Sequence, residues 1–173
     1  MLLFGDQGYA ERMGVDVTVE QRIERPRNEV ARFAMDPAND TRWILALDSA
    51  RVLPGATGAE GASEVGVGTR VERVAGFLGR RVEYVNQIEE YDPPRRLAMR
   101  SVKAPFPMTV VYEFEESGDG ATLVRIRAGG DPGGFYSVAG PLLSQMVKHG
   151  IRRDLEALKD LMERRWGGVP AEG

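Results

Sequence analysis

Five segments between residues 67 and 129 have the features of short β-strands, and no helical segment separates them. Their side chains alternate between apolar and polar, which is typical of half-buried strands. Turn signals lie between them, such as Asp92-Pro93-Pro94 and the Ser-Gly-Asp-Gly run at 117–120. Parallel strands need a long crossover connection, so these neighbours must pair antiparallel. The sequence therefore predicts an antiparallel meander with strands at 67–75, 80–91, 96–103, 107–116 and 121–129.

Helices and further strands are predicted on both sides of this meander. Alternating valines from Val15 to Val19 predict a first strand, and residues 49–53 predict another short one. Pro26 and the Asp36-Pro37 pair are helix-start signals, so we expect two short helices between these strands. From Ser137, apolar residues recur every three or four positions, with Gly140-Pro141 as an alternative start. This pattern predicts one long C-terminal helix.

The bulk properties indicate one soluble domain. A length of 173 residues is typical of a single domain. We expect residues 1–13 to be a loose N-terminal extension, 14–166 the domain and 167–173 a tail. The N-terminus lacks the basic start and apolar centre of a secretory signal, and no apolar run approaches the ~20 residues of a membrane span. We therefore expect a cytoplasmic protein without a membrane span.

Charge and residue usage narrow the classes of function. The net charge of −3 argues against nucleic-acid binding, which needs a basic surface. The absence of cysteine excludes disulfides, thiolate nucleophiles and cysteine-bound zinc. With a single histidine and scattered carboxylates, we expect neither a metal site nor a cofactor. The oligomeric state stays open, with a homodimer as one alternative.

The predicted order of elements is strand, two short helices, six strands and a long helix. It resembles the START/polyketide-cyclase superfamily, also called SRPBCC or helix-grip. Pro26, Val30 and Phe33 after the first strand carry the likeness, as do the runs VGVGT at 65–69, EYDPPRRL at 90–97 and DLEALK at 154–159. The resemblance covers about residues 14–166. It implies an α+β fold in which a curved seven-stranded antiparallel sheet wraps the long helix around a cavity for an apolar or aromatic molecule.

Strand alternation predicts which side chains face that cavity. On the fourth strand the apolar face carries Tyr84 and Asn86, and on the sixth it carries Met108 and Tyr112. A buried amide or phenol needs a hydrogen-bond partner, which a ligand or the protein itself can supply. Aromatic and apolar walls suit a small-molecule site. We therefore predict ligand-binding residues among Trp43, Arg73, Tyr84, Asn86, Met108, Tyr112, Phe135 and Met146, with plain core packing as the alternative.

Three ionisable residues near the predicted cavity have competing interpretations. Arg73 either pairs with a ligand carboxylate or, as we expect, is turned to solvent by a twist near Val74. Asp154 falls near the buried stripe of the last helix, where we expect a structural ion pair. His149 is the obvious general base by type, but the helical wheel places it well away from that stripe. We expect it at the surface, so no catalytic residue is assigned.

Three functions remain open. The favoured one is binding of an apolar or aromatic, lipid- or polyketide-like molecule in the internal cavity. The resemblance also allows a polyketide cyclase or dehydratase, in which Tyr84, Asn86, Tyr112 and Arg73 would act. The third is a protein-interaction module of the same fold. Fold alone does not select among them.

Overall fold

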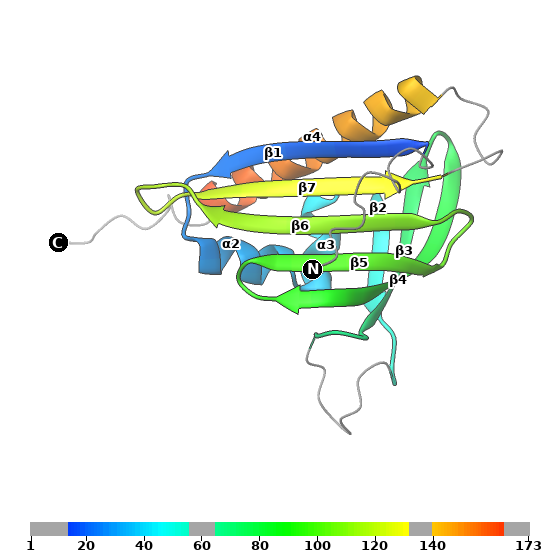
Figure 1. Cartoon of the computed structure of the whole chain (residues 1–173), viewed down its shortest axis with the longest axis horizontal. Helices are drawn as coiled ribbons and strands as arrows, with labels where there is room; N and C mark the ends of the chain where they lie inside the picture. Colours follow the sequence, from blue (N-terminus) through cyan, green and yellow to red (C-terminus); the bar gives the residue numbers. More distant parts are fainter. Residues whose placement is uncertain (1–13, 56–64, 132–139, 165–173) are drawn as a thin grey trace, which may run out of the picture.

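The computed structural model describes residues 14–55, 65–131 and 140–164, and these form a curved sheet with one long helix across its concave face (Figure 1). The helices are α2 (Arg27–Ala34), the 3-10 turn η1 (Pro37–Asn39), α3 (Asp40–Trp43) and α4 (Gly140–Arg164). The strands are β1 (Val15–Ile23), β2 (Leu47–Val52), β3 (Arg70–Phe77), β4 (Arg80–Asp92), β5 (Arg96–Lys103), β6 (Met108–Glu116) and β7 (Thr122–Gly130).

The seven strands form one antiparallel sheet in the order β1-β7-β6-β5-β4-β3-β2. The predicted meander is confirmed, and the first strand joins it by pairing with the last. Alternation decides which face is buried: Val15, Val17 and Val19 are buried, and the residues between them are exposed. The α+β helix-grip fold that the sequence predicts is therefore the fold of this chain, with β1 and β2 as the sheet edges.

The third strand begins later than predicted, at Arg70 rather than residue 67. Gly68 has a φ of 88°, a conformation that favours glycine and interrupts an extended strand. The Thr69 hydroxyl accepts a hydrogen bond from the Gly66 N–H at 3.0 Å, and the Thr69 N–H donates to the Gly66 carbonyl at 3.1 Å. These bonds hold residues 66–69 in a turn, which is why the apolar Val67 is exposed.

The short helices close one end of the sheet and place two side chains on its concave side. The α2 helix buries Val30 and Phe33 against the core. At η1, the Asp36 carboxylate accepts a hydrogen bond from the Ala38 N–H at 2.9 Å, as its predicted capping role requires. The following single turn, α3, directs both Asp40 and Trp43 inward, because residues three apart lie on the same helix face.

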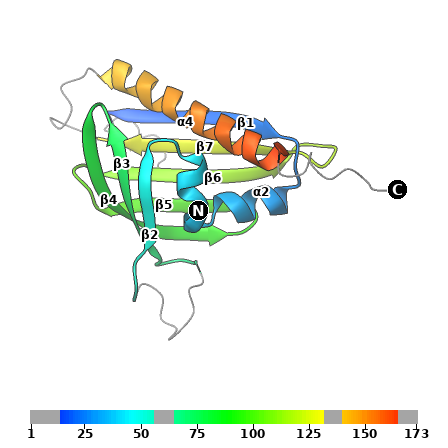
Figure 2. The same ribbon diagram turned by 180° about the vertical axis from the view of Figure 1, so that it is seen from behind.

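The long helix α4 has 25 residues, a length of about 40 Å, and lies across β1 and β7 (Figure 2). It buries Leu143, Leu155, Leu158 and Met162 against the sheet. His149 is exposed, as the helical wheel predicts. No helix in the described part of the chain is long and apolar enough to cross a membrane.

Close packing at the end of β7 leads to a first prediction. Gly130 pairs with Val15 on one side and Met108 on the other, and a Cβ added there would lie 2.6 Å from the Pro107 carbonyl oxygen. Gly130→Ala is therefore expected to lower the free energy of unfolding by about 1–2 kcal/mol through overpacking. Urea denaturation measures this, with Gly76→Ala as control because nothing lies within 4 Å of its added Cβ. Equal stability of the two variants would contradict the prediction.

Candidate functional site

A cavity of about 190 Å³ lies between the concave face of the sheet and α4. Strands β3 to β7 form its floor, while α3 and α4 close it from above. Most of the wall is apolar, with Arg73, Asn86 and Asp154 among its polar side chains. It is lined by Trp43, Ile44, Arg73, Tyr84, Asn86, Met99, Val110, Tyr112, Ile126, Ala128, Val147, Ile151 and Asp154. Five of the eight predicted site residues are in this set; their role in binding stays a prediction.

Arg73 forms a buried ion pair with Asp40. Its Nε and Nη2 atoms both contact the Asp40 Oδ2 atom, at 2.8 and 2.7 Å, and its Nη1 lies 3.7 Å from the Met99 sulfur. The expectation that Arg73 turns to solvent was wrong. The pairing of β3 with β4 continues through Arg73 and Tyr84 without a bulge, so the side chain keeps its inward direction. Asp40 compensates the charge there.

The pKa values of this pair depend on two opposing effects. Burial raises the pKa of Asp40, and the adjacent guanidinium of Arg73 opposes that rise. The carboxylate of Asp40 raises the pKa of Arg73 despite its burial. With two short contacts between the groups, we take both to be ionised at neutral pH. The pair then adds no net charge to the cavity wall.

Two residues that line the cavity each have a buried polar atom without a hydrogen-bond partner within the described residues: Trp43 Nε1 and Asn86 Oδ1. Trp43 is held by the core and by an edge-to-face contact with Tyr112, with ring centroids 5.7 Å apart. Asn86 is held by strand pairing, opposite Val71 and Ser101. A buried donor or acceptor without a partner costs about 1–3 kcal/mol. Both atoms are therefore unpaired polar groups in residues that line the cavity.

The two tyrosines of the cavity stay protonated at neutral pH. Burial raises the pKa of Tyr84, with Arg73 opposing the shift. Burial also raises the pKa of Tyr112, which is almost fully enclosed. Both hydroxyls can donate or accept hydrogen bonds, but neither is suited to act as a phenolate base.

Asp154 reaches the cavity from α4. Its Oδ1 atom accepts a hydrogen bond from the Leu45 N–H at 2.9 Å. Within the described residues no cation lies at ion-pair distance from it, so the expected structural ion pair was wrong. The cause is tertiary: the end of α3 packs against α4 and offers a backbone N–H instead. Burial raises the pKa of Asp154 to about 6, which the Leu45 hydrogen bond and Arg153 only partly offset.

The other three predicted site residues lie elsewhere. Met108 lines a smaller, apolar cavity next to the first. Met146 is half-buried on α4 and lines neither of these two cavities. Phe135 lies outside the described residues. Sequence patterns missed Asp40, whose partner is 33 residues away. The one available signal was its spacing of three from Trp43, which places both on one face of a helical turn.

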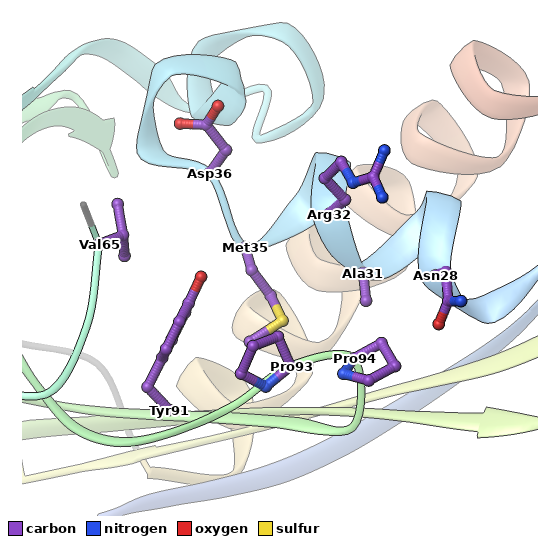
Figure 3. A pocket seen from close by; sticks show the side chains of 9 residues that line it. All are labelled: Asn28, Ala31, Arg32, Met35, Asp36, Val65, Tyr91, Pro93 and Pro94. Carbon is purple, nitrogen blue, oxygen red and sulfur yellow. The ribbon is translucent and has the colours of Figure 1, made fainter. Parts of the chain in front are cut away.

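A larger groove of about 500 Å³ lies apart from this cavity, between α2 and the turn after β4 (Figure 3). Arg32 and Asp36 rim it, and Met35, Tyr91 and the two prolines at 93–94 form its base. None of the predicted site residues lies there. Its polar side chains Asn28, Arg32 and Asp36 are exposed to water, so they do not require a ligand. The inner cavity is therefore the stronger candidate. Nowhere in residues 14–55, 65–131 and 140–164 do three or more potential metal ligands cluster.

Comparison with known proteins agrees with the helix-grip fold. A family model described as polyketide cyclase / dehydrase and lipid transport matches residues 14–163. No match was found among curated proteins.

Three solved structures are similar to this chain, and each match covers almost the whole of the other protein's chain. A START superfamily protein from Mycobacterium smegmatis has a TM-score of 0.72 at 10% identity, covering 87% of this chain and 98% of that one. The Zhui aromatase/cyclase from Streptomyces sp. R1128 has a TM-score of 0.70 at 17% identity, covering 90% and 98%. A protein from Thermus thermophilus has a TM-score of 0.69 at 21% identity, covering 87% and 99%. At these identities the likeness establishes the fold alone.

Proposed function

Since the chain belongs to the polyketide cyclase / dehydrase and lipid transport family, we propose that it binds a small, uncharged aromatic molecule carrying a hydroxyl group in the cavity between the sheet and α4. The observation that carries this proposal is the pair of buried atoms without partners, Trp43 Nε1 and Asn86 Oδ1. One is a donor and the other an acceptor. A hydroxyl group can accept from an indole N–H and donate to an amide oxygen.

The size and charge of the cavity support an uncharged ligand with one or two rings. An apolar cavity of about 150 Å³ is known to bind benzene in another protein, and this cavity is somewhat larger at about 190 Å³. The guanidinium of Arg73 is occupied by Asp40 and Met99, so a ligand carboxylate would have to compete with an existing ion pair. A neutral hydroxyl avoids that competition.

Phenol and toluene, which differ by a hydroxyl in place of a methyl, test the proposal. We expect phenol to bind about fivefold more tightly, because one net hydrogen bond contributes about 1 kcal/mol. Titration followed by NMR on the Trp43 indole N–H signal measures both affinities. Trp166→Phe removes the only other tryptophan and assigns the signal. The Trp43 signal should move in the direction of a hydrogen-bonded indole with phenol and not with toluene.

Matched asparagine variants locate the binding site. Asn86→Leu removes the buried acceptor and should abolish most of the preference for phenol. Asn28→Leu changes an exposed asparagine in the larger groove beside α2 and should leave the preference intact. If Asn28→Leu abolished the preference and Asn86→Leu preserved it, the ligand would bind in the groove instead. If neither phenol nor toluene bound, the proposal would be refuted.

A second candidate function, proton transfer to a bound substrate, is favoured by Asp154. A group whose pKa lies near neutral can both accept and donate a proton at physiological pH. Asp154 borders the same cavity, and burial brings its pKa to about 6. This would make the chain a cyclase or dehydratase rather than a carrier. Its pKa is the first quantity to measure for that alternative.

A further inference from the structure

A second, smaller cavity of about 100 Å³ lies next to the cavity described above. Val110, Ala128 and Val147 line both cavities, so they form the boundary between the two, here called the constriction, where β6, β7 and α4 meet. We call the first cavity the inner chamber and the second the outer chamber. The outer chamber is lined in addition by Val15, Phe77, Phe106, Met108, Thr109, Gly129, Gly130 and Leu143. It lies at the end of the sheet that carries the β3–β4 and β5–β6 turns (Figure 1).

The two chambers differ sharply in polarity. The inner chamber is lined by Arg73, which pairs with Asp40, and by Asn86, Asp154 and Trp43. Among the described residues, the lining of the outer chamber has no charged side chain, and Thr109 is its one residue with a polar side chain. Phe77 lies at the β3–β4 turn and Phe106 at the β5–β6 turn, while Leu143 closes the chamber from α4. A molecule that occupies both chambers would therefore have polar surroundings at one of its ends and apolar surroundings at the other.

We infer that the ligand is a phenol with a short alkyl tail, bound with its ring and hydroxyl in the inner chamber and its tail through the constriction into the outer chamber. This inference rests on the proposed function and adds the length, polarity and direction of the ligand. If each tail carbon needs about the ~30 Å³ share of a water molecule, a chamber of about 100 Å³ holds a tail of about three to four carbons.

The polarity of the two chambers favours this orientation. In the reverse orientation, a hydroxyl in the outer chamber would lose its hydrogen bonds to water and gain no equivalent partner among the apolar walls. The tail would then lie against Trp43 Nε1 and Asn86 Oδ1, leaving both without partners. The inferred orientation satisfies the polar atoms and removes the tail from water.

A series from phenol to 4-pentylphenol tests the inference, with affinities measured as for phenol itself. We expect affinity to rise roughly fourfold per added carbon, the ratio that corresponds to burial of one methylene group, and to level off after three to four carbons. Two variants fill the outer chamber from opposite sides, Val15→Phe from the sheet and Leu143→Phe from the helix. Each should flatten the rise, and thermal unfolding identifies any variant that does not fold.

Leu142→Phe is the matched control, because Leu142 neighbours Leu143 on α4 but is 55% exposed. It should preserve the rise with tail length. A rise that persists in a folded filled variant would overturn the inference, because the tail would then lie elsewhere. Phenol binding with no dependence on tail length would also overturn it, while leaving the proposed function intact. Failure of every probe, phenol included, would overturn both.

Discussion

Replacing Asp40 with asparagine is expected to lower the free energy of unfolding by about 3–5 kcal/mol. The change keeps the size of the side chain and removes the charge that faces Arg73. Arg73 is only 4% exposed, so water cannot replace the lost carboxylate. Removing one partner of a buried ion pair leaves an uncompensated charge, which is the origin of this large cost.

Urea denaturation at neutral pH measures the loss. Asp48→Asn is the matched control, because Asp48 is exposed on β2, and it should change stability by less than about 0.5 kcal/mol. The double variant Asp40→Leu with Arg73→Met should recover most of the stability, since an apolar pair of similar size removes both charges. Similar stability of Asp40→Asn and Asp48→Asn would contradict an ionised pair in the core.

Asp154 should make stability fall as the pH rises from about 4 to 7. Burial raises the folded-state pKa of Asp154 to about 6, against an ordinary value of 3.8. Between these values the folded state holds a proton that the unfolded state has released, so the contribution of this group is fully present below pH ~4 and is lost through pH ~6. A shift of about two units corresponds to about 3 kcal/mol, or about 2 kcal/mol allowing for partial exposure.

Asp154→Asn removes this titration. Its stability relative to the unsubstituted protein should therefore rise by about 2 kcal/mol between pH 4 and pH 7, measured by denaturation across that range. Glu156→Gln, an exposed position on the same helix, should show no comparable trend. Direct NMR titration of the Asp154 carboxyl gives the pKa itself. A value near 3.8 would remove the argument for proton transfer in the cavity.

Residues placed by the period of a strand were predictable. Tyr84 and Asn86 share a face of β4, and Tyr112 faces the same side on β6, because side chains alternate at every step of a pleated strand. Once the sheet is antiparallel and one face is apolar, that face must be buried. The direction of these side chains into the cavity is therefore contained in local sequence, and the structure places all three on its wall.

Residues placed by the packing of distant elements were not predictable. Asp40 meets Arg73 across 33 positions, and Asp154 meets Leu45 across 109. Neither spacing repeats with the period of a helix or strand, so no sequence pattern could reveal it. The separation of Met108 from the other site residues likewise depends on where α4 crosses the sheet, because the constriction is formed jointly by Val110, Ala128 and Val147.

The sequence by itself thus determined the sheet, the helix and the apolar face, since each follows from hydrophobic periodicity and turn chemistry acting over a few residues. Tertiary structure alone decided that Arg73 is neutralised, that Asp154 faces a backbone N–H, and that a cavity lined by polar side chains lies next to an apolar one. The physical reason is that burial and charge compensation depend on which side chains meet across the core, and that is set only when α3 and α4 pack against the sheet.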